Sequence, residues 1–426
     1  MKNKLGATLA PAPMLFAIAL ALVSVSGHCD WFSSITGMLG SKGKGMNANI
    51  TADEASHIKI VREVILEIGR APTPHALAQT KDGGYVIAGS VWVPWATRVD
   101  ANGNVVWRYE LSAYNPSAPK EGKGHYNSTA VLPDDSAIFC GEMELAPTPE
   151  KRVGDIVGML THLDKAGRLM SHQLLYPNSD KDYSLSRLDK CMSWGDGVAV
   201  VGHVSHFPKQ GGREDSFWLI ALDGNGEIKW EKIIPKVRDG DAVVMPNQDL
   251  LIFSGFERNG TIWNAGSIRL DKNGEIKSQR TDQVFGKLVT PVVAEPVLRQ
   301  FLSGYDNRPA ALKTLSEQGE DMGLAKFEIR PLSPEQIYLM PDHALVFFGT
   351  EYGAKGGESP SAGITWLSAD LKNSETFTFR NKSYSAGIDD AVPTGKPGEF
   401  VTVRRAIEIS HQDKRQGVVL AFVQVK

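Results

Sequence analysis

The sequence predicts an all-β protein assembled from a repeated unit of four short strands. Two patterns recur in alternation and carry this prediction. Three apolar or small residues followed by glycine occur at 86–89, 138–141, 199–202, 252–255, 301–304 and 346–349. A polar turn ending in glycine or asparagine occurs at 100–103, 164–167, 223–226, 271–274, 316–319 and 370–373. Around these patterns lie short runs of β-branched and aromatic residues, which favour strands and are too short for helices.

The first repeat shows how one unit is built. We predict its strands at 75–80, 84–90, 95–100 and 104–110. In the turn from Asp100 to Gly103, the glycine accepts a positive φ, and the aspartate side chain accepts hydrogen bonds from nearby backbone N–H groups. In the sixth copy, Asn373 stands where this pattern expects the residue with positive φ.

The number of repeats predicts a seven-bladed β-propeller with four-stranded antiparallel blades. Six copies span 75–380, and three further strands are expected at 387–392, 400–409 and 417–425. The seventh blade then lacks its outer strand. The apolar segment 58–68 is expected to supply that strand and close the ring, which would protect an open sheet edge.

The N-terminus is typical of an export signal, which predicts a periplasmic or secreted protein. Lys2 and Lys4 precede an apolar run from Met14 to Val23, and small residues follow it. This run is too short to span a hydrocarbon core of about 30 Å, so no transmembrane segment is expected after its removal. We predict a signal peptide at 1–27, a flexible leader at 28–56 and a single propeller domain at 57–426, monomeric in solution. Lipid attachment at Cys29 is the alternative.

Composition and short motifs exclude several function classes. A formal charge of −3 argues against a general nucleic-acid binder. The sequence contains no CxxC or HExxH pattern, so we predict neither a metal site nor a cofactor. Cys140 and Cys191 are expected to be buried thiols, with a disulfide as the open alternative.

Two of the polar turns resemble those of a known group of proteins. The segments Asp100-Ala-Asn-Gly-Asn-Val-Val-Trp107 and Asp223-Gly-Asn-Gly-Glu-Ile-Lys-Trp230 are similar to the outer-strand turns of bacterial quinoprotein-like propellers. The resemblance implies that each tryptophan docks its blade onto the neighbouring blade. The other four repeats have Ser171, Ser278, Gly323 and Phe377 at this position, and the resemblance carries over no cofactor or catalytic residue.

The predicted loops indicate which face binds a target. The loops between the second and third strands differ in every blade, and variable loops on a rigid scaffold commonly carry recognition. They are expected at 90–95, 142–155, 203–215, 256–260, 305–308, 350–361 and 406–416.

Ten residues near these loops are candidate binding residues. Trp92 and Trp95 either form an exposed aromatic platform or cap the core. Four acidic residues follow the repeated glycine at nearly equivalent positions and form either an acidic ring near the axis or solvated loop charge: Glu142, Glu257, Asp306 and Glu351. Arg404 and Arg405, which replace the glycine in the seventh blade, are expected to balance that ring. His203 and Tyr352 complete the set.

The leading functional hypothesis is an exported module that docks a protein partner through the long-loop face, with an inhibitor or immunity-type protein as one version. The alternative is an enzyme or small-ligand binder, carbohydrate-active or quinone-dependent, that uses an axial pocket. A structural part of an envelope assembly is a third hypothesis. No catalytic residues are assigned, because glycosidic chemistry requires set carboxyl separations, and the sequence contains no Gly-x-Ser-x-Gly elbow or P-loop.

Overall fold

The structure of the protein is a computed structural model. It describes residues 57–426 apart from gaps at 69–71, 92, 112–122, 146–154, 179–182, 209–211, 246, 259–261, 284–286, 292–297, 303–309, 317–320, 328–331, 352–360, 380–386 and 408–415. The predicted signal peptide, the leader and Cys29 therefore lie outside the described residues. No helix among the described residues has the length and apolar character needed to cross a membrane.

The described elements are 28 strands that fall into groups of four. The first group is β2 (Thr73–Gln79), β3 (Tyr85–Val91), β4 (Val93–Val99) and β5 (Val105–Glu110). The second is β6 (Gly124–Val131), β7 (Ala137–Glu144), β8 (Ile156–Leu163) and β9 (Leu169–Leu175). The third is β10 (Tyr183–Trp194), β11 (Gly197–His206), β12 (Glu214–Leu222) and β13 (Ile228–Pro235). The fourth is β14 (Val237–Val244), β15 (Leu250–Arg258), β16 (Ile262–Leu270) and β17 (Ile276–Gln283).

The remaining strands continue the series. The fifth group is β18 (Lys287–Pro291), β19 (Leu298–Leu302), β20 (Ala310–Leu315) and β21 (Asp321–Phe327). The sixth is β22 (Leu332–Leu339), β23 (Leu345–Glu351), β24 (Ser361–Leu367) and β25 (Ser374–Thr378). The last is β26 (Ile388–Pro393), β27 (Glu399–Ile407), β28 (Gln416–Val425) and β1 (Ile58–Leu66).

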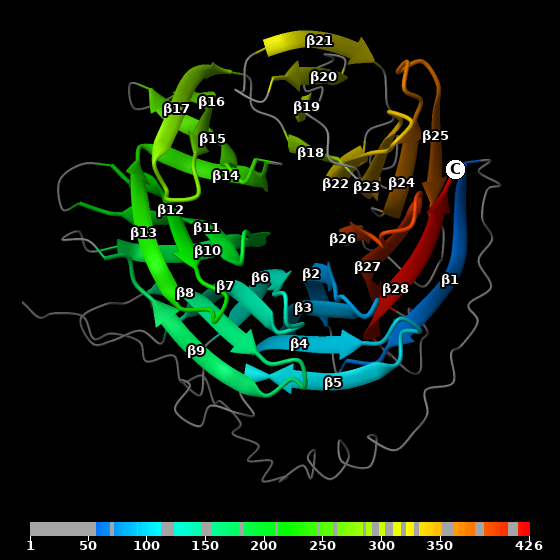
Figure 1. Cartoon of the computed structure of the whole chain (residues 1–426), viewed down its shortest axis with the longest axis horizontal. Coiled ribbons are helices and arrows are strands. Elements are labelled where there is room, and N and C mark those ends of the chain that lie inside the picture. The colour runs from blue at the N-terminus through cyan, green and yellow to red at the C-terminus, as the bar shows by residue number, and fades with distance from the viewer. Residues whose placement is uncertain are drawn as a thin grey trace, which may run out of the picture. The chain divides into compact units, whose positions relative to one another are not determined.

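Within each group the strands pair antiparallel with their neighbours, and successive groups follow one another around a common centre (Figure 1). The innermost strands β2, β6, β10, β14, β18, β22 and β26 contact one another in this order, and β26 contacts β2. Short parallel pairings join β8 to β10 and β18 to β22, which merges those groups into two larger sheets. This arrangement confirms the prediction of an all-β, propeller-type fold.

The strand at the N-terminal end of the described residues lies beside the end of the chain (Figure 1). β1 pairs antiparallel with β28, from Ile58 opposite Val425 to Leu66 opposite Val418. An ion pair of 2.6 Å between Arg404 Nη2 and Glu63 Oε1 adds a side-chain contact to the same sheet. β1 therefore occupies the outer position in this sheet that the sequence predicted for it.

The polar turns have the predicted geometry in four copies. Gly103, Gly167, Gly226 and Gly274 have φ between 79° and 83°. The Asp100 carboxylate accepts hydrogen bonds of 2.8 Å from the backbone N–H groups of Asn102 and Asn104. The aspartate carboxylate of each turn is thus hydrogen-bonded to backbone N–H groups of the same turn.

The prediction for the sixth turn is wrong in register. Leu371, not Asn373, has the positive φ, at 60°. The turn begins at Ser368, whose carbonyl accepts from the Leu371 N–H at 2.8 Å. It is closed by a hydrogen bond of 2.9 Å from the Ser368 N–H to the Asn373 carbonyl. The loop is one residue longer than the others, because Ser368 and Asn373 are joined where the first turn joins Asp100 and Asn104.

Both repeat tryptophans pack on the turn of the next group. A Cβ built on Gly167 would lie 2.6 Å from Trp107 Cγ, and one built on Gly274 would lie 2.7 Å from Trp230 Cη2. Trp107 Nε1 also donates to the Lys165 carbonyl at 3.1 Å. Glycine at these turns therefore serves both the positive φ and the close approach of the aromatic ring.

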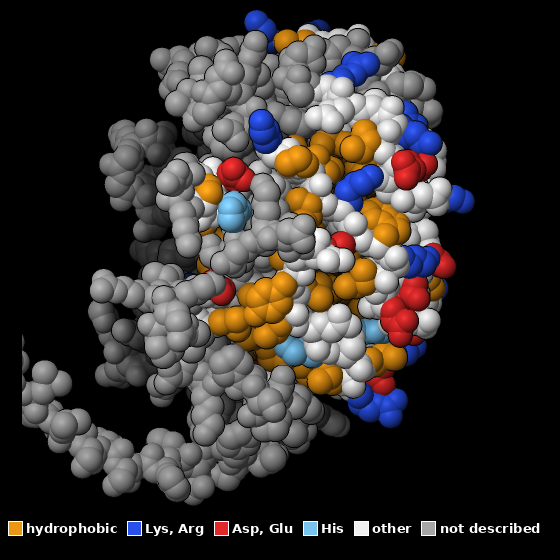
Figure 2. All heavy atoms as spheres, turned by 90° about the vertical axis from the view of Figure 1, so that its left-hand side faces the viewer, with side chains coloured by type: hydrophobic (Ala, Val, Ile, Leu, Met, Phe, Trp, Pro, Cys, Tyr) orange, Lys and Arg blue, Asp and Glu red, His pale blue; other side chains and the backbone are white. Residues whose placement is uncertain are grey.

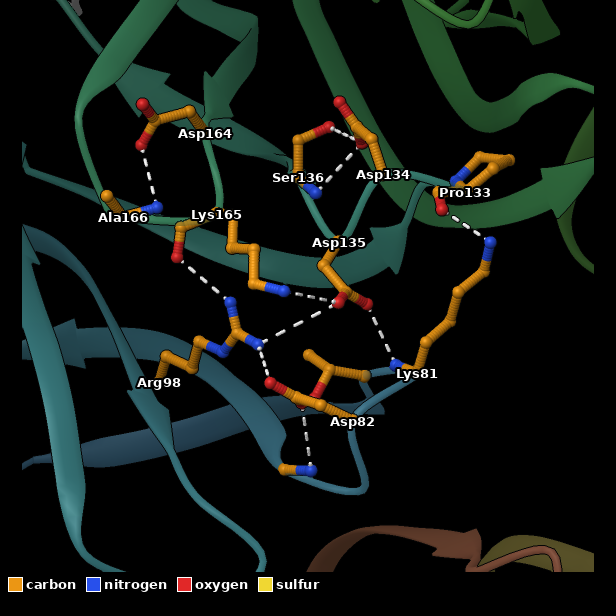
Figure 3. A network of polar contacts seen from close by, with 12 residues as sticks. Lys81, Asp82, Arg98, Pro133, Asp134, Asp135, Ser136, Asp164, Lys165 and Ala166 are labelled. Carbon is orange, nitrogen blue, oxygen red and sulfur yellow. Dashed lines mark hydrogen bonds and ion pairs between the residues drawn. The ribbon is translucent and has the colours of Figure 1, made fainter.

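The turn end of the first two groups carries a dense polar network (Figure 3). Arg98 is 3% exposed, and its Nη2 donates to Asp82 Oδ2 at 2.6 Å while Nη1 donates to the Lys165 carbonyl at 2.9 Å. Asp135 accepts from the Lys81 N–H at 2.8 Å and from Lys165 Nζ at 3.2 Å. We call this end of the sheets the turn face.

The outer strands carry a mixed surface. Exposed apolar side chains stand near the start of several of them, including Val106, Met170, Ile228 and Ile276. On the side shown in Figure 2, hydrophobic side chains lie among uncharged polar groups, and most of the Lys, Arg, Asp and Glu side chains lie toward one edge. Such dispersed apolar residues are ordinary for a protein surface.

Candidate functional site

The innermost strands share a β-bulge at the same position. In β2, Pro74 pairs with Gly89 and Ala76 pairs with Ala88, so His75 is the extra residue. Five other innermost strands, β6, β10, β14, β22 and β26, have the same irregularity. The extra residues are all polar, and we call them the bulge ring: His75, Asn127, Asp189, Asp239, Glu335 and Asp389. Bulges turn a side chain out of the regular sheet, and they are common beside functional sites.

The repeated glycine of the sequence accompanies five of the six bulges. It stands opposite the residue that precedes the bulge, as Gly202 does opposite Leu188. In the last group Arg404 takes this place opposite Ile388. A Cβ on Gly202 would lie 2.0 Å from the Arg187 carbonyl oxygen, and the corresponding distance is 2.0 Å for Gly89 and Gly141. No side chain fits at this separation, so glycine is what allows the bulged backbone to approach. The repeated glycine, on the second strand of a group, thus indicates the position of the bulge on the first strand.

Five residues of the bulge ring line a pocket of about 380 Å³, which we call the axial pocket. Its lining residues are His75, Asn127, Asp189, Glu335, Thr350, Gly387, Ile388 and Asp389. Five of these are bulge residues from the innermost strands of five different groups, so the pocket lies where these strands converge. Thr350 is close to the end of β23, and Gly387 directly precedes β26. The pocket is therefore near the strand ends that lead into the predicted long loops, opposite to the turn face.

Asp389 is the most perturbed carboxylate of the pocket. Burial raises its pKa to about 7, with a further contribution from the nearby Glu335 and Asp390 carboxylates, against the lowering effect of the Arg405 backbone N–H. Its Oδ2 atom is buried and has no hydrogen-bond partner among the described residues. The free protein therefore does not compensate the charge of Asp389 fully.

The adjacent Asp390 is buried for a structural purpose. Its Oδ2 accepts from the Leu77 N–H at 2.8 Å, and its Oδ1 accepts from Gln336 Nε2 at 2.8 Å. Burial raises its pKa to about 6 in spite of these bonds. Asp390 thus ties β26 to the innermost strands on both sides and does not line the pocket.

Two titratable residues, His125 and Glu142, extend the site outward from His75. The rings of His75 and His125 lie 5.4 Å apart, and burial together with His125 lowers the pKa of His75 to about 4. His75 is therefore neutral at pH 7. His125 Nε2 lies 3.6 Å from Glu142 Oε1, and Glu142 Oε2 is buried with no hydrogen-bond partner among the described residues. Glu142, a predicted site residue, is thus connected to the pocket through two histidines.

His203 positions another pocket carboxylate, contrary to its predicted place at a loop surface. It is 2% exposed and lies within β11, because this strand extends to His206. Its Nδ1 lies 2.9 Å from Asp189 Oδ2, and Arg187 Nε lies 2.8 Å from Asp189 Oδ1. Asp189 is therefore already paired with two basic groups.

Two other predicted site residues have a different role from the expected one. Trp95 is 1% exposed and belongs to the core, because β4 begins at Val93 and takes Trp95 into the sheet. The exposed-platform interpretation is wrong for this residue. Arg404 is 2% exposed and pairs with Glu63 across the last sheet, and its guanidinium lies 4.5 Å from the Phe379 ring centroid. Arg404 is thus engaged in the last sheet. Arg405, in contrast, lowers the pKa of Asp389 both through its backbone N–H and through its charge.

Some of the remaining predicted site residues lie outside the residues that the structure describes. Trp92, Asp306 and Tyr352 are outside the described residues. Glu257 lies in β15 and Glu351 in β23, but their side chains are not described. Cys140 and Cys191 are buried free thiols, as expected. Among the described residues, no group of three or more His, Cys, Asp or Glu is arranged to hold a metal ion.

The bulge residues themselves were missed from sequence. The acidic ring was sought one or two residues beyond the repeated glycine, whereas the polar ring belongs to the strand that faces it. A polar residue followed about 14 residues later by the repeated glycine is the signal that could have located most of it, as with His75 and Gly89.

Comparison with known proteins gives no family for this chain. No protein-family model matches the sequence, and no curated protein matches it either. Among solved structures, the polysaccharide lyase Uly1 is 11% identical, covering 84% of this chain and 91% of its own, with a TM-score of 0.49. The Dos1 propeller is 12% identical, covering 86% and 81%, with a TM-score of 0.41. An α-L-arabinofuranosidase from Fusarium graminearum is 9% identical, covering 70% and 92%, with a TM-score of 0.39. The fold assignment rests on the strand pairing described above, to which similarities of this size add no argument.

Proposed function

We propose that this chain is an exported binding module that docks a protein partner over the axial pocket. The observation that carries the proposal is the bulge ring, which turns polar side chains from five groups of strands into one pocket. A scaffold that repeats the same irregularity around a common centre is suited to recognition, because rigid strands fix the positions of the side chains.

We further infer that the seven groups are seven blades of one ring, with β1 as the outer strand of the last blade. The antiparallel pairing of β1 with β28 and the contact of β26 with β2 support this inference. A closed ring would hold the bulge residues at fixed mutual distances. The periplasmic or secreted location and the monomeric state remain part of the proposal.

Site-specific photocrosslinking tests the proposal. A photoreactive amino acid at Asn127, in the axial pocket, should trap a partner from the exported fraction of the native host. The matched control places it at Asn225, in a turn on the turn face, where no adduct is expected. Equal adducts from both positions, or an adduct from Asn225 alone, would contradict docking over the pocket.

A second candidate is supported by the protonation of Asp389. A buried carboxyl group with a pKa raised to about 7 beside a second carboxylate is the arrangement of a general acid with its partner. A pair of carboxyl groups in these two roles is what a carbohydrate-active enzyme requires. Hydrolysis of an oligosaccharide panel by the wild type, lost in folded Asp389→Asn, would support this candidate, and no hydrolysis by the wild type would remove it.

A further inference from the structure

The residues that line the axial pocket give it a definite charge character. Three of them, Asp189, Glu335 and Asp389, are carboxylic acids, and none is lysine or arginine. The pocket histidine adds no positive charge at pH 7, because the pKa of His75 is lowered to about 4 by burial. The ligand that fits this lining carries a positive charge.

The carboxylates of the pocket differ in how they are paired, and this indicates which of them a positively charged ligand would contact. Asp189 already has Arg187 and His203 within 2.9 Å. Lys190 is occupied as well, since its Nζ contacts Asp241 Oδ1 at 2.7 Å and the Ala242 carbonyl at 2.9 Å. Asp389, by contrast, has a buried Oδ2 without a hydrogen-bond partner among the described residues. The nearby Glu335 and Asp390 carboxylates oppose ionisation of Asp389, and the charge of Arg405 favours it. A cationic group in the pocket would add to the effect of Arg405 and favour the ionised form of Asp389.

The size of the pocket distinguishes an organic cation from a metal ion. About 380 Å³ is within the range of pockets for small molecules and side chains. A bare metal ion needs several ligands converging at about 2–2.5 Å, and no such group occurs among the described residues. An ammonium or guanidinium group at the end of a flexible chain satisfies both the volume and the charge.

We propose that the axial pocket binds a lysine or arginine side chain of the protein partner, held by Asp389 and Glu335. This inference rests on the proposed function, since docking over the pocket is what brings a side chain of the partner to the bulge ring. The protein partner, not a free amine, is the source, because the pocket lies at the strand ends that lead into the long loops.

Ligand-observed saturation-transfer NMR with the full chain tests the inference. The probes are acetyl-Gly-Lys-Gly-amide and acetyl-Gly-Arg-Gly-amide, with the isosteric neutral acetyl-Gly-norleucine-Gly-amide and the free amine 1,5-diaminopentane as comparisons. We expect transfer to one of the cationic peptides and at least about fivefold less to the norleucine peptide. Equal transfer to the norleucine peptide, or transfer to the free amine alone, would overturn the inference.

Matched variants assign the binding to the pocket. Asp389→Asn and Glu335→Gln preserve shape and remove charge, and together they should weaken binding of the cationic peptide by about tenfold. Asp196→Asn is the control, because Asp196 is 83% exposed in the turn between β10 and β11 and should leave binding unchanged. Undiminished binding by the folded double variant would overturn the inference.

A measurement on the wild type tests the ion pair without depending on the folding of a variant. Raising NaCl from 50 to 500 mM should weaken binding of the cationic peptide several-fold and leave any signal from the norleucine peptide unchanged. Insensitivity to salt would count against the ion pair. If photocrosslinking at Asn127 captures a partner while no cationic peptide binds, the docking proposal stands and the cationic side chain is wrong.

Discussion

The two ends of the sheets use the same residue type in opposite ways. On the turn face, aspartates are surrounded by donors. A hydrogen bond from Thr80 and contact with Arg98 lower the pKa of Asp82 to about 2, and backbone N–H groups of its own turn lower the pKa of Asp223. In the axial pocket, burial raises the pKa of Asp389 to about 7.

This difference in carboxyl pKa distinguishes the turn face, which we interpret as structural, from the axial pocket, which we propose as the binding end. A carboxylate whose pKa is lowered stabilises the fold when ionised, and it has little to gain from a ligand. A carboxylate whose pKa is raised by burial is held by the rest of the fold at a cost to stability. The polar groups of the turn face are paired within the chain, whereas we propose that the axial pocket is completed by a ligand.

The largest effect is expected from the glycine that faces the bulge. Gly202→Ala places a Cβ about 2.0 Å from the Arg187 carbonyl oxygen, so the bulge must move or the sheet must open. We expect a loss of about 3 kcal/mol or more in the free energy of unfolding, measured by denaturant titration. Gly212→Ala is the control, because nothing lies within 4 Å of a Cβ at this position. Equal stability of the two variants would show that the bulge does not depend on glycine.

A similar but smaller loss is expected on the turn face. Arg98→Leu removes a buried guanidinium that donates to Asp82 and whose charge lies 4.0 Å from the carboxylate of Asp135, a side chain that is 8% exposed. Breaking such a pair costs about 3 kcal/mol. The control Arg168→Leu removes an arginine that is 83% exposed, and exposed pairs contribute about 0–1 kcal/mol. Thermal unfolding of both variants checks this, and a neutral Arg98→Leu would remove the claim that the turn face is held by its network.

The pH dependence of stability should distinguish the two ends. The folded protein binds more protons at Asp389 than the unfolded chain between about pH 4 and pH 7, so ionising Asp389 makes unfolding easier as the pH rises through this window. The shift corresponds to about 4 kcal/mol at most, and access of water to the pocket reduces our expectation to about 2 kcal/mol. Asp389→Asn should therefore gain about 2 kcal/mol relative to the wild type between pH 4 and pH 8. The lowered pKa of His75 acts equally in both proteins and cancels. A constant difference across this range would contradict the raised pKa.

The smallest effect is expected at a single turn. Asp100→Ala removes hydrogen bonds to the N–H groups of Asn102 and Asn104 and should cost about 1 kcal/mol. Because the aspartate stabilises the fold when ionised, this cost should shrink as the pH falls below about 4. A loss that persisted unchanged in acid would show that its charge is unimportant.

The sequence predicted the body of the molecule well because turns and strand alternation are local. Positive φ at Gly103 and hydrogen bonding to Asp100 follow from four consecutive residues, and the strand 58–68 follows from its apolar pattern. Leu371 was missed because the turn there is one residue longer and a bulky residue accepts the strained backbone. The site was harder to predict because Gly89 and His75 lie on two neighbouring strands. The bulge at His75 brings the backbone of its strand so close to Gly89 that a Cβ there would clash, and no motif in consecutive residues reveals this contact. Trp95 and His203 were misplaced for one shared reason: their strands extend further than the loops predicted around them.

Carboxyl NMR of ¹³C-labelled aspartate tests the contrast between the two ends most directly, with Asp389→Asn and Asp223→Asn used to assign the two resonances. We predict that Asp389 titrates near pH 7 in the free protein, that a bound lysine or arginine peptide shifts its midpoint downward, and that Asp223 titrates below its usual range and ignores the peptide. An ordinary midpoint near pH 4 for Asp389, unmoved by either peptide, would contradict the account.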